Sequence, residues 1–172
     1  MVTSTLKAIG RIDTKVYDDE SLPDDWGSLS DSEKLSLLRD VEPVESYTDY
    51  NTTVNGMHVY FAQNLDGSQS VDKDAAYLAV GNDDTAPTAS DSTLTNEVFR
   101  KQVTDYSQTG NKLLASTFIQ SSEANGETFR EVGLFAGSNP SDTMFNHSTI
   151  SDIVKDGTRT ITIDVTLQFT AQ

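Results

Sequence analysis

The residues of this sequence that could do chemistry are few, and most of them are carboxylates. His58 and His147 are the only histidines, and neither has a spacing that suggests a metal pair or a nucleophile with its base. The sequence holds no GxSxG, HExxH or GxxxxGK motif. There is no cysteine, so disulfides and thiolate metal sites are excluded. We therefore expect a non-enzymatic protein in which both histidines are structural.

Two groups of aspartates could bind a hard cation such as Ca²⁺ or Mg²⁺ through oxygen. The groups are Asp66, Asp72 and Asp74, and Asp83, Asp84 and Asp91. Neither follows the twelve-residue calcium loop with its terminal glutamate. In so acidic a chain, clusters of this kind arise by chance. We expect no cofactor, and the second group supplies the candidate metal ligands.

Two of the five arginines, Arg100 and Arg130, lie beside phenylalanines in predicted strands. A guanidinium group forms strong paired hydrogen bonds with carboxylates. We expect Glu97 and Glu131 to be such partners, as structural contacts within the chain or across subunits. The alternative is an exposed arginine with no fixed partner.

The charge balance restricts the partners of the protein. The formal net charge is -15, from 27 acids against 12 bases, and 19 of the acids are aspartates. Such a surface repels phosphate backbones, so we expect no nucleic-acid binding. The composition indicates adaptation to molar salt, where screening shortens the reach of repulsion; the alternative is an ordinary acidic protein. No apolar run approaches the roughly 18 residues of a membrane span, so membrane insertion is not expected.

The first 50 residues are predicted to form an N-terminal arm or extension. LKAIGRIDTKVY alternates weakly and could form a strand. Ser30 and Glu33 have the spacing of a capping box and predict a short helix that ends before Pro43.

Residues 51–172 are predicted to form the main domain, which begins with a helix. Val54, Met57, Phe61 and Leu65 fall on one helical face, and Asn51 or Thr52 could cap its start. The rest reads as about six strands joined by polar turns, with a surface loop over residues 82–92. The last strand is the clearest, because apolar residues alternate with polar ones from residue 160 to 169. The predicted fold is mainly β: an antiparallel β-sandwich with one or two short helices.

Several short motifs occur in a recognisable order along the main domain. They are YLAVG (77–81), TAP (85–87), NEVFRK (96–101), EANG (123–126) and EVGLF (131–135). In this order they resemble a small structural module of tail-fibre, tail-collar and baseplate proteins of tailed phages. With the acidic composition, the resemblance suggests a tailed virus of a haloarchaeon.

The resemblance implies a structural protein of the virion, assembled in the host cytoplasm, as a baseplate or tail-fibre anchoring or adaptor component. Its partners would be other tail or baseplate proteins and copies of itself, as a homotrimer or another symmetric homo-oligomer. One alternative is a capsid decoration or turret protein. Another is a module that binds host-surface carbohydrate, with aromatic side chains as stacking groups. The aromatic candidates are Trp26, Tyr47, Tyr50 and Tyr106.

Overall fold

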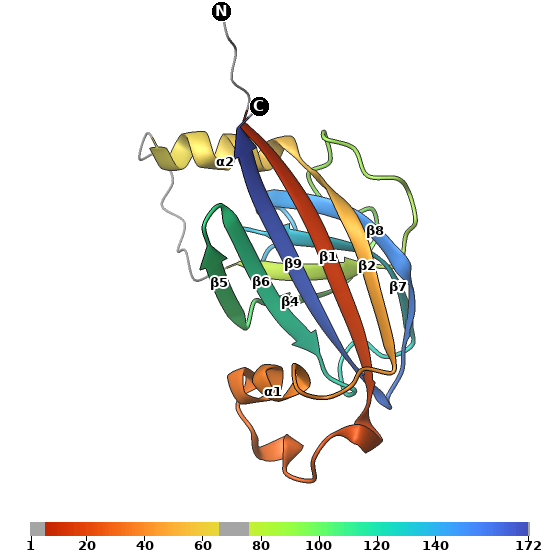
Figure 1. Ribbon diagram of the computed structural model, residues 1–172. Helices are drawn as coiled ribbons and strands as arrows, with labels where there is room; N and C mark the ends of the chain where they lie inside the picture. Colours follow the sequence, from red (N-terminus) through yellow and green to blue (C-terminus); the bar gives the residue numbers. More distant parts are fainter. Residues whose placement is uncertain (1–5, 66–75, 172) are drawn as a thin grey trace, which may run out of the picture.

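The computed structural model of the chain is mainly β and describes residues 6–65 and 76–171 (Figure 1). The strands are β1 (Leu6–Asp18), β2 (Glu45–Thr53), β3 (Tyr77–Gly81), β4 (Glu97–Gln102), β5 (Asp105–Thr109), β6 (Lys112–Ile119), β7 (Glu127–Phe135), β8 (Met144–Lys155) and β9 (Arg159–Ala171). The helices of the described residues are η1 (Asp19–Ser21) and η2 (Trp26–Ser28), both short 3-10 helices, and α1 (Asp31–Leu38) and α2 (Asn55–Leu65). None of these helices combines the length and the apolar character that a membrane crossing requires.

All nine strands belong to one antiparallel sheet, with the order β4-β3-β7-β8-β2-β1-β9-β6-β5. The sheet curls into a half-barrel. The prediction of a mainly β, antiparallel fold with short helices is confirmed, whereas the predicted sandwich is not confirmed. The described residues form nine strands instead of about six, because the predicted segment that covers residues 98–106 divides into β4 and β5, β1 joins the sheet, and β2 was not recognised.

The curl folds one half of the sheet over the other. β2 and β8 join the halves through only two residue pairs, and in Figure 1 the strands of the second half cross behind those of the first. The main core lies between the halves: Ile12 and Val165 come from the first, and Val132 and Ile153 from the second. Each of these four side chains is fully buried. Burial of a side chain of this size stabilises the fold by about 1.5–3 kcal/mol.

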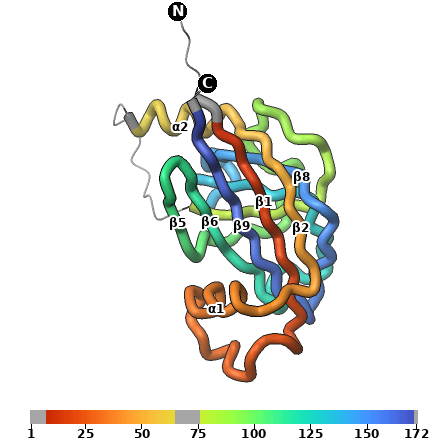
Figure 2. Tube along the Cα trace, in the orientation of Figure 1, coloured from red at the N-terminus to blue at the C-terminus, as the bar shows by residue number. Residues whose placement is uncertain are grey.

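The first strand is not part of a separate arm. β1 pairs with β9 along its whole length and with β2 on its other side, so it lies in the middle of the sheet. Figure 2 shows β1 and β9, the first and last strands, running side by side. The predicted division into an arm (1–50) and a main domain (51–172) therefore does not correspond to a boundary in the sheet. The sequence did not reveal the central position of β1, because its apolar alternation is weak. Gly10 and Thr14 occupy inward positions on either side of Ile12, where apolar side chains would be expected.

The alternation of β9 sets the inner face of the half-barrel as predicted. Ile161, Ile163, Val165 and Leu167 are buried in the main core. The opposite face was predicted to meet water, but Thr160 and Thr162 are buried as well. The helical segment that follows β1 covers this end of the outer face.

α1 begins at the predicted capping box. The Glu33 amide donates to Ser30 Oγ, and the Glu33 carboxylate accepts from the Ser30 amide at 2.8 Å. The helix buries Leu35 and Leu38 against Tyr17 and Phe118 on the outer face of the sheet. Figure 1 shows α1 at the lower end, leaving the upper part of that face uncovered.

α2 begins later than the sequence suggests. Asn51 and Thr52, the predicted caps, belong to β2, a strand that the sequence analysis did not identify because its residues are mostly polar. Met57 of α2 is buried in the main core, whereas Phe61 is 37% exposed at its edge. The helix therefore packs on one open end of the half-barrel.

Gly133 in β7 marks a close approach, since a Cβ there would lie 2.8 Å from the Phe135 ring.

Candidate functional site

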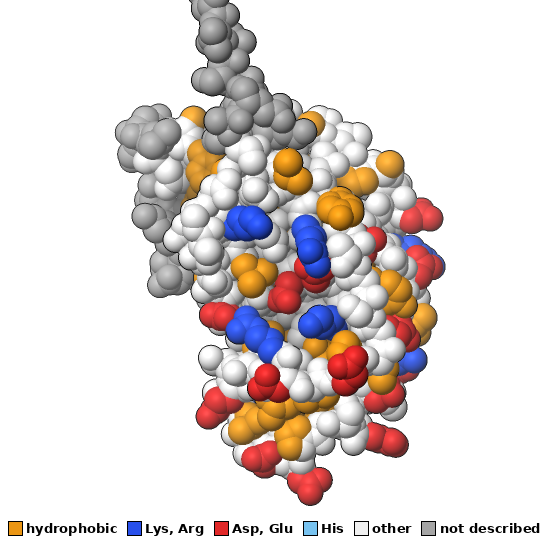
Figure 3. All heavy atoms as spheres, in the orientation of Figure 1, with side chains coloured by type: hydrophobic (Ala, Val, Ile, Leu, Met, Phe, Trp, Pro, Cys, Tyr) orange, Lys and Arg blue, Asp and Glu red, His pale blue; other side chains and the backbone are white. Residues whose placement is uncertain are grey.

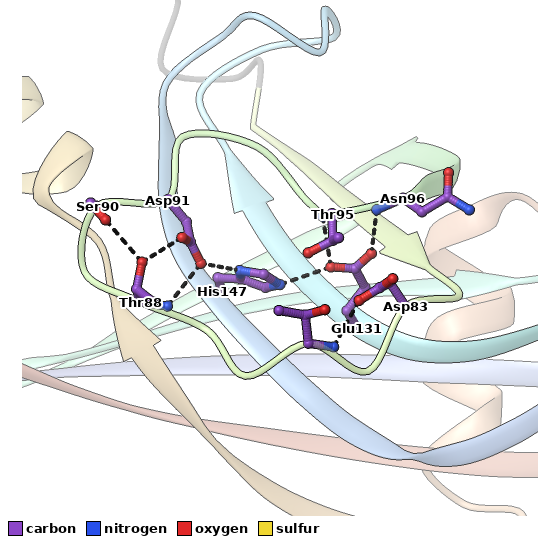
Figure 4. Close-up of polar contacts among 9 residues, drawn as sticks. Asp83, Thr88, Ser90, Asp91, Thr95, Asn96, Glu131 and His147 are labelled. Atoms are coloured by element: carbon purple, nitrogen blue, oxygen red, sulfur yellow. Dashed lines mark hydrogen bonds and ion pairs between the residues drawn. The ribbon is translucent and has the colours of Figure 1, made fainter.

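A buried cluster of ionisable side chains centres on His147 of β8 (Figure 4). His147 Nδ1 lies 2.8 Å from Asp91 Oδ2, and Nε2 lies 2.8 Å from Glu131 Oε2. His147 and Glu131 are each 1% exposed. We call these three residues the histidine clamp, because they attach the loop of residues 82–96 to the sheet.

Strand pairing brings Glu131 to the loop. Glu131 lies in β7 opposite Gly81, the last residue of β3, after which loop 82–96 begins. The returning end of the loop donates the Thr95 and Asn96 amides to the Glu131 carboxylate at 2.9 and 2.8 Å. A side chain at position 81 would clash with Glu131 Oε1, so the site requires glycine there. One carboxylate thus holds a neighbouring strand's loop and a histidine together.

Asp91 fixes the middle of the same loop. Its carboxylate accepts the Thr88 amide at 2.8 Å and the Thr88 hydroxyl at 2.5 Å, closing a tight turn, and it also contacts His147. The loop is therefore attached at its centre through Asp91 and at its end through Glu131. A long polar segment without secondary structure acquires a defined position in this way.

The three groups of the histidine clamp hold each other ionised. Burial is the largest influence on His147 and by itself would lower its pKa, but hydrogen bonds and charges of Glu131 and Asp91 outweigh it, so the pKa is raised. Burial alone would raise the pKa of each carboxyl, but the hydrogen bonds that each accepts outweigh burial, so both pKa values are lowered. The result is an imidazolium that donates both of its N–H groups to carboxylates.

This geometry suits attachment better than proton transfer. A catalytic histidine keeps one ring nitrogen directed at a nucleophile or a substrate, and here a carboxylate occupies each nitrogen. The other histidine, His58, lies on α2, distant in sequence from the clamp's two strands and loop. The structural role predicted for His147 agrees with its contacts. The sequence did not predict its contacts with Asp91 and Glu131, because these residues lie 56 and 16 positions away from His147.

The three metal candidates do not converge. Asp83 accepts the Thr85 amide at 2.7 Å, and hydrogen bonding from Thr85 lowers its pKa, while Asp91 is committed to the histidine clamp. Within residues 6–65 and 76–171, no group of three His, Cys, Asp or Glu residues could hold a metal ion. The other predicted group, Asp66, Asp72 and Asp74, lies outside the described residues.

The predicted pairing of Arg100 with Glu97 is present within the chain. Arg100 donates Nε and Nη2 to the two Glu97 oxygens at 2.8 and 2.6 Å, and Nη1 to the carbonyls of Gly137 and Asn139 at 2.9 Å each. Its guanidinium carbon lies 3.8 Å from the centre of the Phe135 ring. Arg100 therefore ties β4 to the turn after β7.

Within the chain, Glu131 is not the carboxylate partner of Arg130. Successive residues of a strand point to opposite faces; Glu131 points toward His147, and Arg130 points away. Arg130 instead contacts Asp152 of β8 at 3.2 Å and donates to the Asn82 carbonyl at 3.2 Å. This ion pair is exposed, with side chains 36% and 63% accessible, so it contributes little to stability.

A second buried cation escaped the sequence analysis. Lys155, the last residue of β8, is fully buried, and its Nζ donates to Asn125 Oδ1 at 2.7 Å and to the carbonyls of Asp156 and Ser121 at 2.8 and 3.2 Å. Burial lowers its pKa. We call this group the lysine clamp, and it holds the loop that contains the EANG motif. A lysine at the end of an alternating strand gives no sequence signal of burial.

Comparisons with protein-family models, with curated proteins and with solved structures find no match to this chain.

Proposed function

We propose that this chain is a non-enzymatic structural protein of a tailed virus, working in the baseplate or as an anchoring piece for tail fibres. One observation carries the proposal: the motifs that resemble tail modules come together as one connected unit. YLAVG forms β3, which lies between β4, built from NEVFRK, and β7, which ends in EVGLF. The Asn96 amide of NEVFRK donates a hydrogen bond to the Glu131 carboxylate of EVGLF.

The polar contacts of this unit support a structural role. The histidine clamp and the Arg100–Glu97 pair hold a loop and a turn in place, and both are buried or half-buried. A subunit that must present a fixed surface to its neighbours gains from such loops, since ordering them beforehand lowers the entropy cost of assembly.

The sheet also offers places for self-association. β4 and β5 are its two edge strands, each paired on one side only among the described strands. An unpaired edge can receive a strand from another chain. We propose a symmetric homo-oligomer, such as a homotrimer, in which the two halves of the curled sheet act like the two layers of a sandwich. The acidic composition suits assembly at molar salt in a virus of a haloarchaeon.

The decisive experiment is a cryo-EM map of the intact particle that carries this protein. Density for the half-barrel in the baseplate or at the fibre attachment point supports the proposal. Density on the capsid surface would instead favour a decoration or turret protein, and absence from the particle would reject both. Light scattering of the purified chain at about 1 M salt tests the oligomer separately; a strict monomer would contradict self-association.

A further inference from the structure

The outer face of the half-barrel carries a groove that no part of the proposed function uses. It lies over β1, β2, β5, β6 and β9, on the side away from the main core, and has a volume of about 550 Å³. Small-molecule sites typically measure about 300–1,000 Å³. Figure 3 looks onto this face, which α1 covers only at its lower end.

Positive charge gathers on this face of an otherwise acidic protein. In Figure 3 Lys and Arg side chains lie around the centre of the face together with a few acidic side chains, and further Asp and Glu side chains lie toward its lower end and rim. Among lysines and arginines with described side chains, Lys15 and Lys112 have no hydrogen bond or ion pair. Register places both on this face, Lys15 opposite Thr162 and Lys112 opposite Gln168. An anionic ligand would meet two cations on this face that have no hydrogen bond or ion pair within the described part of the chain.

The groove itself is lined by one aromatic ring and by both hydrogen-bond donors and hydrogen-bond acceptors. Tyr50 is 75% exposed and pairs in register with Arg11, whose side chain is 55% exposed. Arg11 donates Nε and Nη2 to Asp13 at 2.9 and 2.7 Å, which holds the guanidinium in place. Further donors and acceptors come from Lys112, Thr166 and Gln168.

A saccharide matches this combination better than other ligands do. Its hydroxyls both donate and accept hydrogen bonds, and the C–H face of its ring packs on an exposed aromatic side chain. A purely apolar ligand would leave the cations and the Asp13 carboxylate desolvated without compensation. A carboxylate on the sugar would form an ion pair with Lys112, which has no other charged partner among the described residues.

We propose that the outer groove binds an acidic saccharide of the uronate class, with its carboxylate at Lys112 and Arg11, its ring against Tyr50, and its hydroxyls at Asp13, Thr166 and Gln168. Of the four aromatic residues that the sequence offered for stacking, only Tyr50 lines this groove. Trp26 packs edge-on against Phe118, Tyr47 packs against the core, and Tyr106 lines a different, apolar cavity. The inference is independent of a place in the virion.

Isothermal titration of the full chain with short oligogalacturonates tests the proposal, at about 0.5 M salt to suppress diffuse attraction. The methyl-esterified form of the same oligosaccharide is the matched neutral ligand, and polyglutamate is the matched polyanion. We expect binding of the free acid, much weaker binding of the ester, and none of polyglutamate. No binding of the free acid at millimolar concentration, or equal binding of polyglutamate, would overturn the proposal.

Variants locate the binding face. Tyr50→Ala is expected to weaken binding about tenfold, and Lys112→Gln about threefold to tenfold. Arg130→Gln removes one positive charge from an exposed ion pair outside the groove and should leave the affinity unchanged. All three side chains are at least partly exposed, so folding is retained, and melting curves verify it. An equal loss in Arg130→Gln would show that net charge alone attracts the ligand and would reject the groove.

Discussion

Two buried cations hold two loops of this protein, and they are neutralised in opposite ways. In the histidine clamp the imidazolium of His147 lies between two carboxylates, Asp91 and Glu131. In the lysine clamp the three partners of Lys155 are neutral oxygens, two backbone carbonyls and an asparagine amide. Both cations belong to β8, eight residues apart, and each fixes a polar connection between strands.

The difference appears in the protonation of the two cations. Carboxylate partners raise the pKa of His147 even though burial opposes this, whereas neutral partners leave burial in control and lower the pKa of Lys155. The charges of Asp156, Asp19 and Glu123 also raise the pKa of Lys155, but they do not outweigh burial. Direct hydrogen bonds to carboxylates, which only His147 makes, therefore distinguish the two cations. The two clamps should therefore respond differently to mutation and to pH.

The largest effect is expected from breaking the histidine clamp on one side. Glu131→Gln removes a fully buried negative charge and leaves the imidazolium with a single carboxylate. Removing one partner of a buried ion pair costs about 3–5 kcal/mol, so we expect a loss of about 3 kcal/mol in the free energy of unfolding. Urea denaturation measures it, and hydrogen exchange should show faster exchange of the Thr95 and Asn96 amides.

The neighbouring residue provides the control for this variant. Arg130→Gln breaks an ion pair on the opposite face of the same strand, where both side chains are exposed. Its cost should lie within about 0–1 kcal/mol. Similar losses in the two variants would mean that burial does not distinguish the clamp from a surface pair.

A smaller effect is expected in the lysine clamp. Lys155→Met leaves three acceptors without their donor but also removes a charge that was costly to bury. We expect a loss of about 2 kcal/mol, with faster hydrogen exchange confined to residues 120–126. Lys15→Met is the matched control on the exposed sheet face and should change stability by no more than about 0.5 kcal/mol. A loss in Lys155→Met above that of Glu131→Gln would contradict the ranking of the clamps.

The pH dependence separates the clamps by sign. The raised pKa of His147 gives stability that is complete below its unfolded pKa of about 6.5 and is lost as pH rises through the folded pKa. The lowered pKa values of Asp91 and Glu131 give stability that is present above about 4 and is lost as pH falls through their folded values. The histidine clamp should therefore be strongest between about pH 4.5 and 6.5.

Lys155 contributes the opposite slope. Its lowered pKa means that Lys155 loses its proton at a lower pH in the folded state than in the unfolded state. The cost of burying the charged lysine therefore disappears, and the free energy of unfolding rises, as pH increases from the folded toward the unfolded pKa. Denaturation of the wild type, His147→Gln and Lys155→Met across pH resolves the two contributions. If the fall in stability above pH 6.5 persists in His147→Gln, the histidine is not its source.

The smallest effect is expected from salt, and it should spare both clamps. Lowering salt from about 1 M to 0.1 M lengthens the screening distance from about 3 to 10 Å, which strengthens repulsion among exposed carboxylates. We expect a melting temperature about 3 °C lower, from a loss of about 1 kcal/mol. Hydrogen exchange at the Thr95 and Asn96 amides should change no more than elsewhere. A melting temperature that is unchanged by salt would reject adaptation to a saline environment.

Local patterns predicted the local elements well. The capping box at Ser30 and Glu33 starts α1, and the alternation from Ile161 to Leu167 gives the inner face of β9. A run of four residues can signal each of these, because helix capping and strand alternation involve neighbours in sequence. β2 was missed for the same reason: its residues ESYTDYNTT are half-buried between β1 and β8 without an apolar pattern of their own.

The candidate site was predictable only in part. Arg100 and Glu97 are three residues apart, so their pairing could be inferred from sequence. The histidine clamp could not be inferred, because its three members come from a loop and two strands, and only strand pairing brings Glu131 beside His147. The same pairing turned Arg130 to the opposite face, away from the partner that its position suggested.

The sequence alone determined most of the strands, with β2 as the exception, and the polar turns, and it showed that the protein is strongly acidic. Only the tertiary structure decided that β1 lies at the centre of the sheet, that His147 and Lys155 become buried clamps, and that Lys112 and Arg11 line a groove with the exposed Tyr50 on the outer face. The physical reason is that alternation and capping depend on adjacent residues, whereas strand order and register depend on which distant surfaces bury one another best.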